Sequence, residues 1–380
     1  MNSKQAEFEN QFIEIDDQWV TLAERMRHYR IPGASIGYVG GNELLWSAGY
    51  GYLEAGITAR VQTDTPFQAA SLSKPHAAIG VQRLFEMTGL ALDSPVIRHT
   101  SWAIPCRTCG ATINWSGNVT VKETLQHKGG FIGRGNTCPL DKCSNFTAGG
   151  GGFDGYPVGQ QLPTLDQILA GTHPANSPPI ELTTMPGEGA DAFHYSGMGY
   201  VVMMRMVQDM TGLEFRDWAE ANVLRPMGMN ASTFRIDLPP SLPLAAAGHD
   251  TNGEPIPGLR NRYPESAAAG LYTNAGDLCR TIIMLNCGGV VGGTRILSAE
   301  QATDMLRQQI GIFTANDPGE KDYLFNHSGE NYGFTTFMQG FPNQGAGMAI
   351  MLNIDNKNGI GSDFYSEAVN ALVRVYGLVS

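Results

Sequence analysis

Hydrophobic residues recur at helical spacing near the start of the chain. Five of them follow one another at alternating steps of three and four residues: Phe12, Ile15, Trp19, Leu22 and Met26. Such spacing puts side chains on a single face of an α-helix. The pattern therefore predicts an amphipathic helix within residues 12–26, at the opening of the fold.

Two pairs of short apolar runs predict β-hairpins, one near each end of the chain. Residues 34–39 and 44–48 are separated by Gly40-Gly41-Asn42, and residues 335–340 and 346–352 by Pro-Asn-Gln-Gly. Gly, Asn and Pro favour the tight turns that join antiparallel strands. Ser35 lies inside the first run in a formal Gly-x-Ser-x-Gly match, but that nucleophile motif requires a turn between strand and helix. We therefore expect Ser35 to be a strand residue.

The chain ends in a helical pattern with apolar residues on one face: Tyr365, Val369, Leu372 and Tyr376. Strand patterns at both ends with helical patterns between them predict an α+β fold, in which an antiparallel sheet is flanked by helices. We expect one catalytic domain over residues 1–380. Residues 1–99 and 261–380 would form its α/β part and residues 100–260 an inserted, mostly helical part, with the active site in the cleft between them.

Composition and charge narrow the classes of function. The formal net charge is −11, which disfavours binding to nucleic acid. No apolar run approaches the roughly 20 residues of a membrane span, and the first residues lack the apolar core of a signal peptide. We expect no nucleic-acid partner and no membrane span, and the chain as numbered favours a cytoplasmic location. The oligomeric state stays open.

The six cysteines fall into two groups. Four are close enough in sequence to act together: Cys106, Cys109, Cys138 and Cys143. They could bind a structural zinc ion, form disulfides or remain free thiols, and their spacing does not choose among these. Cys279 and Cys287 lie in an apolar stretch, and we expect both to be buried packing residues.

Ser71-Leu72-Ser73-Lys74 is the strongest candidate for chemistry. Residues three apart on a helix are neighbours, so the Ser71 hydroxyl and the Lys74 amine can meet. A serine needs a base to become a nucleophile, and a desolvated lysine can lose its proton near neutral pH. Taken alone, the pair would rather indicate a helix-capping serine followed by a solvated lysine.

Further motifs in the chain resemble the serine beta-lactamase-like family, which includes class C beta-lactamases, D-alanyl-D-alanine carboxypeptidases and related esterases. The family places Ser-x-x-Lys, Tyr-x-Asn and Lys-Thr-Gly or His-x-Gly in this order. Here the matching residues are Ser71 to Lys74, Tyr195-Ser196-Gly197 and His327-Ser328-Gly329. The similarity covers roughly residues 30–375, and it implies the family's fold with no cofactor.

The resemblance assigns roles to these residues. Tyr195 would be a general acid or base, and we expect the nearby lysine to hold its phenol partly ionised. The strand beginning near His327, Ser328 and Gly329 would line the substrate site and supply one oxyanion N–H, with Ser71 supplying the other. His127-Lys128-Gly129-Gly130 resembles a family loop near the cleft and is expected to be structural.

Two positions depart from the family pattern. Gly197 stands where beta-lactamases have asparagine, and His327 where they have lysine. Histidine has a reference pKa near 6.5, so it would bind a substrate carboxylate less reliably at neutral pH. An exposed loop histidine is the alternative interpretation of His327. Both departures favour esters or neutral amides over beta-lactams.

The sequence therefore predicts a serine hydrolase that cleaves a small ester, amide or short peptide through an acyl group on Ser71. Two alternatives remain at this point. An acyltransferase would use the same residues to pass the acyl group to an alcohol or amine. A penicillin-binding or sensor protein would be acylated without turnover.

Overall fold

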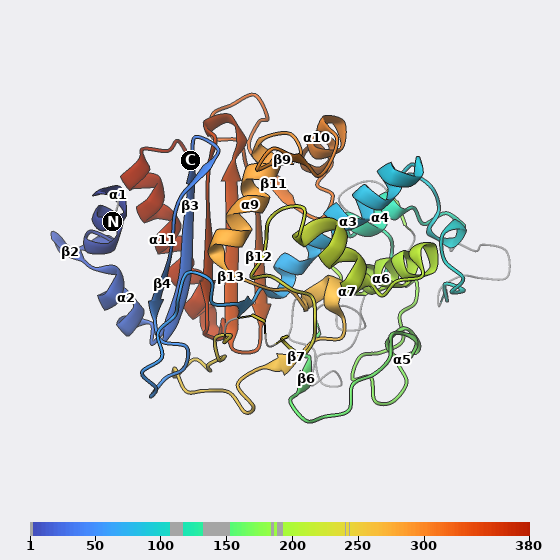
Figure 1. The fold of residues 1–380 in the computed structure, drawn as a ribbon, viewed down its shortest axis with the longest axis horizontal. Coiled ribbons are helices and arrows are strands. Elements are labelled where there is room, and N and C mark those ends of the chain that lie inside the picture. Colours follow the sequence, from blue (N-terminus) through green and yellow to red (C-terminus); the bar gives the residue numbers. More distant parts are fainter. Residues whose placement is uncertain are drawn as a thin grey trace.

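The computed structural model describes residues 3–106, 117–131, 153–183, 186–187, 193–239, 241–242 and 244–380. Its centre is a six-stranded antiparallel sheet in the order β11-β12-β13-β14-β3-β4 (Figure 1). The strands of this sheet are β3 (Gly33–Gly40), β4 (Glu43–Gly51), β11 (Phe313–Ala315), β12 (Leu324–Asn331), β13 (Phe334–Phe341) and β14 (Ala346–Leu352). The sheet thus joins the two ends of the chain.

Both predicted hairpins are confirmed. β3 pairs with β4 across Gly41 and Asn42, which both adopt positive φ angles of 61°. β13 pairs with β14, and β14 also pairs with β3, so that Ile350 lies opposite Ile36. Ser35 lies on β3 as expected, and its buried hydroxyl accepts a hydrogen bond from the Ala275 N–H.

The helix predicted over residues 12–26 is wrong. The segment contains a short hairpin of β1 (Ile13–Ile15) and β2 (Gln18–Val20), placed between α1 (Ser3–Asn10) and α2 (Leu22–His28). Asp16 and Asp17 turn the chain with φ angles of 50° and 60°, a conformation that short polar side chains tolerate. Thr21 and Glu24 then form a capping box that starts α2. The apolar residues are spaced as in a helix, but the chain turns at Asp16 and Asp17, and hydrophobic spacing alone does not reveal such a turn.

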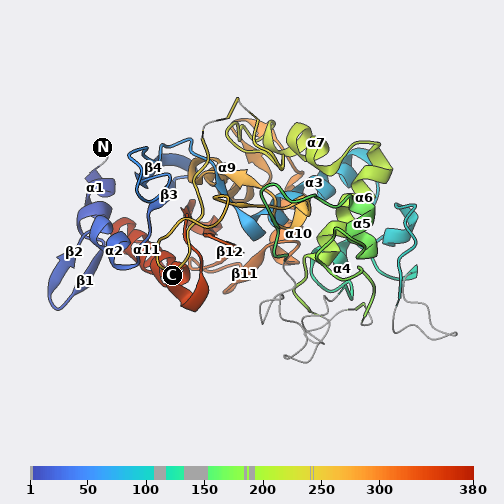
Figure 2. The same cartoon turned by 90° about the horizontal axis from the view of Figure 1, so that it is seen from below.

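One face of the sheet is covered by α1, α2 and the C-terminal helix α11 (Ile360–Tyr376), which lie together in both views (Figures 1 and 2). Phe12 of the N-terminal segment stacks on Phe364 of α11 at 5.4 Å between ring centroids. The predicted final helix is confirmed, but its buried stripe is displaced by about one position from the expected one. The fully buried members are Gly361, Phe364, Ala368, Ala371, Leu372 and Val375.

The other face of the sheet is covered by α9 (Ala275–Asn286), beyond which lies the helical part (Figure 1). Its longest helices are α3 (Ser73–Thr88) and α6 (Met198–Thr211). Shorter helical segments are α4 (Val121–Leu125), α5 (Leu165–Ala170), α7 (Phe215–Ala219), η6 (Glu220–Leu224), α8 (Ser266–Ala269) and α10 (Ala299–Arg307). Short strand pairs are β5 (Phe67–Gln68) with β8 (Tyr272–Thr273), β6 (Tyr156–Pro157) with β7 (Asn261–Arg262), and β9 (Val290–Val291) with β10 (Thr294–Arg295). The 3-10 turns are η1 (Ala70–Leu72), η2 (Val96–Arg98), η7 (Pro342–Gln344) and η8 (Lys357–Gly359).

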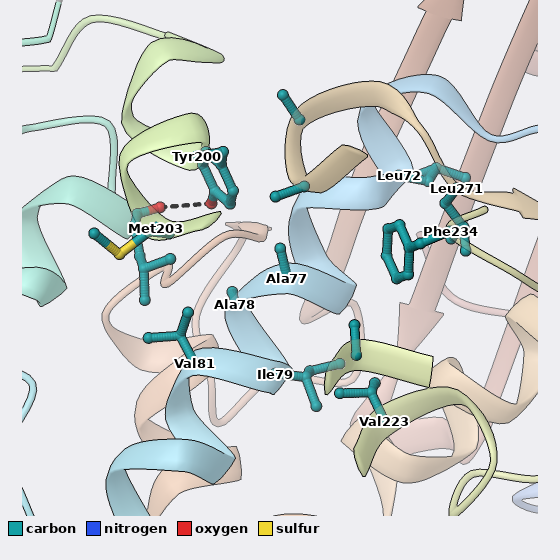
Figure 3. Packing of buried hydrophobic residues seen from close by; sticks show 14 of the residues in the cluster. Leu72, Ala77, Ala78, Ile79, Val81, Tyr200, Met203, Val223, Phe234 and Leu271 are labelled. Atoms are coloured by element: carbon teal, nitrogen blue, oxygen red, sulfur yellow. Dashed lines mark hydrogen bonds between the residues drawn. The ribbon is translucent and has the colours of Figure 1, made fainter. Parts of the chain in front are cut away.

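Helix α3 follows directly on the turn that contains Ser71, and it is packed into the core. Ala77, Ile79 and Val81 are fully buried among residues of α6, η6 and the segment around Leu271 (Figure 3). Fully burying a valine or isoleucine contributes about 1.5 to 3 kcal/mol each. The start of α3 is therefore fixed by the surrounding core.

The structure tests part of the predictions made for the cysteines and for membrane spans. Cys106 is disulfide-bonded, whereas Cys109, Cys138 and Cys143 lie outside the described residues. Cys279 is buried as expected, but the prediction for Cys287 is wrong, because this residue follows the last turn of α9 and is exposed. Within the described segments, no helix is both long and apolar enough to cross a membrane.

Candidate active site

Ser71 lies in the 3-10 turn η1, immediately before α3, and is half-buried. Ala70 before it adopts a φ of 51°, which is uncommon for a residue with a side chain. The hydroxyl of Ser73 stabilises this turn, since it donates to the Ala70 carbonyl at 2.6 Å and accepts from the Leu271 N–H at 2.9 Å. The neighbouring serine of the motif therefore fixes the backbone that presents Ser71.

Lys74 meets Ser71 as the spacing of the motif predicted. Its Nζ donates to Ser71 Oγ at 2.9 Å and to the Ala268 carbonyl of α8 at 2.9 Å. The residue is only 1% exposed, and burial lowers the pKa of the amine to about 7. Among the described residues, no carboxylate forms an ion pair with Lys74 to oppose this effect. A large fraction of Lys74 is therefore uncharged at neutral pH.

Tyr195 reaches the same site from the segment before α6. The Lys74 Nζ lies 4.8 Å from the centroid of its ring, and the phenol hydrogen-bonds to Ser71. Burial raises the pKa of Tyr195 above its usual value of 10, more strongly than the contact with Ser71 lowers it. The expectation of a partly ionised phenol is therefore wrong, because desolvation disfavours the phenolate. The phenol of Tyr195 therefore keeps its proton at neutral pH.

Gly197 occupies the N-cap of α6 and is buried. Glycine offers no side-chain acceptor, and among the described residues Lys74 hydrogen-bonds to Ser71 and to the Ala268 carbonyl. A neutral amine has two N–H donors and one lone pair. When Lys74 is neutral, Nζ can therefore donate to the Ala268 carbonyl while its lone pair faces the Ser71 hydroxyl.

His327, Ser328 and Gly329 lie on strand β12, in register with Met338, Phe337 and Thr336 of β13. The other edge of β12 pairs with β11 only over residues 324–326. Beyond that point β12 lies against the Ser71 turn, and a Cβ placed on Gly329 would come within 2.9 Å of the Ser71 nitrogen and 2.5 Å of the Ala69 carbonyl oxygen. Glycine is therefore the residue that permits this approach.

His327 is buried, at 2% exposure, so the alternative of an exposed loop histidine is wrong. Its Nδ1 lies 2.6 Å from the Ser328 carbonyl oxygen, and a carbonyl only accepts, so Nδ1 carries the proton. Burial, with a contribution from the Lys74 charge, lowers the pKa of His327 to about 3. The side chain is therefore uncharged throughout the neutral range and cannot replace a lysine as a cation.

His127 belongs to the site, although its sequence motif suggested only a structural loop. Its Nδ1 lies 3.0 Å from the Ser196 nitrogen and 3.1 Å from the Ser196 carbonyl oxygen, so it pairs with the Ser196 backbone in either tautomer, and its ring centroid lies 4.4 Å from that of Tyr195. The residue adopts a φ of 62° at the end of α4 and is buried. The contact with the residue after Tyr195 depends on a long-range approach, which sequence reasoning missed.

Aromatic rings surround these polar groups. Phe313 of β11 lies 5.2 Å from His327 and 6.4 Å from Tyr195 between ring centroids, and Phe193 lies 5.8 Å from His127. Phe193 is 40% exposed and offers an apolar surface next to the site. Among the described residues, no three His, Cys, Asp or Glu side chains gather in a way that could hold a metal ion.

Sequence comparison places this arrangement in a known family, since the beta-lactamase family model matches residues 21–366. The chain belongs to the beta-lactamase family. Penicillin-binding protein 4 of Amycolatopsis lactamdurans is 25% identical, over 92% of this chain and 87% of the relative. This family and its relatives comprise serine hydrolases and penicillin-binding proteins.

Solved structures have the same beta-lactamase and transpeptidase-like fold. The octameric penicillin-binding protein homologue from Pyrococcus abyssi matches with a TM-score of 0.70 and 22% identity, over 94% of this chain and 76% of that one. The D-amino acid amidase from Ochrobactrum anthropi SV3 matches with a TM-score of 0.66 and 17% identity, over 91% and 94%. The predicted α+β fold class is therefore confirmed.

Proposed function

We propose that this beta-lactamase-family protein cleaves an ester or amide through an acyl-enzyme on Ser71. The observation that carries the proposal is the 2.9 Å contact between Ser71 Oγ and a buried lysine whose pKa is about 7. A serine hydroxyl next to a neutral lysine is an activated nucleophile, because the lysine can take its proton.

The proposed reaction has two steps. Neutral Lys74 takes the proton of Ser71 as Oγ forms a bond to the substrate carbonyl carbon. Tyr195 donates its proton to the leaving alcohol or amine as the old bond breaks, and Lys74 returns a proton to Tyr195. Water then attacks the acyl carbon, releases the acid and restores Ser71. Positioned proton transfer of this kind typically contributes about 10²- to 10⁴-fold in rate.

Backbone donors beside Ser71 support the charged intermediate. The Ser71 N–H lies next to Gly329, at the edge of β12 that has no strand partner among the described residues after position 326. We assign the oxyanion to the space between the Ser71 N–H and this edge, in the region of His327, Ser328 and Gly329. Losing one preorganised donor of this type typically costs about 2.7 to 4 kcal/mol of transition-state stabilisation.

Neutral surroundings favour esters and amides over substrates recognised through a carboxylate. His327 is uncharged and Gly197 provides no amide side chain. The fold shared with a D-amino acid amidase is consistent with an amide substrate, although an ester fits the same residues. No cofactor enters the proposed steps.

Intact-mass spectrometry tests the proposal. The protein and its Ser71→Ala variant are mixed separately with a p-nitrophenyl ester, a D-amino acid amide and a penicillin, while product release is followed. We expect a transient acyl adduct on the wild type with many turnovers, and neither adduct nor turnover with Ser71→Ala. Turnover that survives in Ser71→Ala would contradict the proposal.

The same experiment separates the two alternatives. An adduct that persists without product would indicate a penicillin-binding or sensor protein. Transfer of the acyl group to an added alcohol or amine in preference to water would indicate an acyltransferase. Both outcomes keep Ser71 as the acylated residue and change only the second step.

A further inference from the structure

In addition to Ser73, a residue of the central sheet contacts the turn that presents Ser71. Thr336 lies on β13 opposite Gly329 of β12, and its side chain is fully buried. Its hydroxyl donates to the Ala69 carbonyl at 2.9 Å, and the Gly329 carbonyl oxygen lies 3.3 Å from the same hydroxyl. Ala69 immediately precedes η1, so Thr336 holds the beginning of the turn.

Gly329 allows the hydroxyl of Thr336 to reach the turn. A Cβ on Gly329 would lie 2.5 Å from Thr336 Oγ1 and 2.5 Å from the Ala69 carbonyl oxygen, so it would clash with both atoms of this hydrogen bond. It would also lie 2.9 Å from the Ser71 nitrogen. The hydrogen bond from Thr336 therefore occurs where β12 comes nearest to the proposed nucleophile.

Backbone pairing does not set the distance between β12 and this turn. Within the described residues, no backbone hydrogen bond connects residues 327–331 with residues 68–73. Ladders of such bonds are what fix neighbouring strands to one another. We have assigned the oxyanion to the space between the Ser71 N–H and the edge of β12. The width of this space therefore depends on side-chain contacts.

Side-chain hydrogen bonds provide these contacts at two places. Thr336 bonds to the Ala69 carbonyl, and Asn331 Nδ2 donates to Gln68 Oε1 at 3.1 Å. Asn331 acts further from the nucleophile, because Gln68 precedes Ala69 in the chain. The Ala69 carbonyl also accepts from the Leu72 N–H at 3.0 Å. The Thr336 hydroxyl and the bond that closes the turn thus share one oxygen, whose two lone pairs are both used.

We infer that Thr336 is a positioning residue for the proposed hydrolysis: through the Ala69 carbonyl, its hydroxyl holds the Ser71 N–H at the distance from β12 that the oxyanion requires. The inference rests on the proposed acylation of Ser71 and adds a residue that acts through the backbone of the turn. Oxyanion donors stabilise the transition state when they are fixed in advance, so loosening the turn slows the reaction although no donor is removed.

The decisive variant is Thr336→Val, which keeps the shape of the side chain and removes the hydroxyl. Thr335→Val is the matched control. Thr335 is equally buried and donates to the Ile354 carbonyl at 2.8 Å, but its side chain lies against Gly361 of α11, on the opposite face of the sheet. Each variant loses one buried hydrogen bond to a backbone carbonyl, so both should unfold at a similarly lowered urea concentration.

Turnover of a p-nitrophenyl ester separates the two variants. Both steps of the proposed reaction form an oxyanion, so Thr336→Val should lower kcat by about tenfold or more with little change in KM. Thr335→Val should stay within about twofold of the wild type. The pH at which activity rises should stay near 7 in both variants, because neither change touches Lys74.

An arylboronic acid gives a second measurement. It forms a tetrahedral, anionic adduct with a serine hydroxyl and so resembles the intermediate. Its affinity for Thr336→Val should fall by about the same factor as kcat, and its affinity for Thr335→Val should change little. Thr336→Ser and Thr336→Ala form a further pair that differs only in the hydroxyl, and the serine variant should be about fivefold or more the faster of the two.

Three results would overturn the inference: equal losses of kcat in Thr336→Val and Thr335→Val, equal rates for Thr336→Ser and Thr336→Ala, or an unchanged affinity of Thr336→Val for the boronic acid. A wild-type protein that intact-mass spectrometry shows to remain unacylated on Ser71 would instead overturn the proposed function, and this inference with it.

Discussion

Lys74 Nζ and Ser71 Oγ lie 2.9 Å apart, and the other hydrogen-bond acceptor of Lys74 is the Ala268 carbonyl. An ammonium group in this position has lost nearly all of its water without gaining a carboxylate. Desolvation therefore favours the neutral amine. In the proposed reaction, the burial that places Lys74 next to Ser71 also lowers the pKa of the amine, so that it can act as a base near neutral pH.

The activity should rise with pH through the pKa of Lys74. In the proposed mechanism the base is the neutral amine, so kcat/KM should increase about tenfold per pH unit below pH 7 and level off above it. The decline at high pH should come later than pH 10, because burial raises the pKa of Tyr195. Initial rates with a p-nitrophenyl ester, corrected for spontaneous hydrolysis, would give the profile.

Lys74→Arg is the control for this profile. A guanidinium keeps its proton at every accessible pH, so the variant should lose about 10²-fold or more of the activity without recovering it at pH 9. A wild-type profile with no inflection between pH 6 and 8 would argue against Lys74 as the base.

The buried lysine should also make the stability of the protein depend on pH. Its pKa is about 7 in the folded protein and 10.5 when unperturbed. Between these values the unfolded chain binds a proton that the folded protein lacks, so the free energy of unfolding should rise with pH across this window. Below pH 7 both states carry the proton and the full penalty remains, on the order of 4 kcal/mol.

Lys74→Met removes this penalty while keeping a long side chain. We expect the variant to be more stable than the wild type, with the largest difference at pH 6.5 and a much smaller one at pH 9.5. Urea unfolding at the two pH values would measure it. An equal difference at both would mean that the lysine charge does not set the stability.

Tyr195 and Tyr200 provide a matched pair for the proton donor. Both rings lie near Lys74, at 4.8 and 5.8 Å from Nζ, but the Tyr200 hydroxyl donates to the Leu125 carbonyl whereas that of Tyr195 meets Ser71. Tyr195→Phe should lower kcat by about 10²-fold, since it removes a proton donor to the leaving group.

Tyr200→Phe should instead lower the free energy of unfolding by about 1 kcal/mol, the usual loss for one hydrogen bond, and leave kcat nearly unchanged. Stopped-flow acylation and urea unfolding of both variants would separate the two effects. Similar kinetic losses in the two variants would mean that Tyr195 acts through packing.

The sequence was informative where local chemistry decides the structure. Ser71 and Lys74 meet because of their spacing on one turn of backbone, and the hairpins follow from turn residues such as Gly41 and Asn42. The N-terminal segment was predicted incorrectly, because apolar residues at helical spacing also fit a hairpin that exposes Ile15 and Trp19, at 38% and 41%. Hydrophobic periodicity does not register the left-handed turn between them.

The features of the site that could not be predicted from the sequence are those that depend on contacts between residues far apart in the chain. The direction of the Tyr195 pKa shift depends on how far the fold removes the phenol from water, and the need for glycine at position 329 became apparent only when β12 was placed against Ser71. His127 is 69 residues away from Ser196 in sequence. The sequence motif predicted that His127 lies in a loop near the cleft, but it did not predict the contact with Ser196.

His127 should act as a positioning residue for Tyr195. His127→Ala would remove the side-chain partner of the buried Ser196 backbone, which costs about 1 to 3 kcal/mol, and would open a space beside the Tyr195 ring. We expect a fall in kcat of about tenfold or more through misplacement of the phenol. The pH at which activity rises should stay near 7, since Lys74 keeps its surroundings.

His127→Asn distinguishes positioning from chemistry. Asparagine tolerates the positive φ of 62°, and its amide can accept from the Ser196 N–H or donate to the Ser196 carbonyl, but it cannot transfer protons near neutral pH. Activity in His127→Asn should therefore recover well above that of His127→Ala. If the asparagine variant is as inactive as the alanine one although both remain folded, the imidazole itself takes part in the reaction, and the neutral His127 beside Tyr195 would have to be counted among the proton-transfer groups.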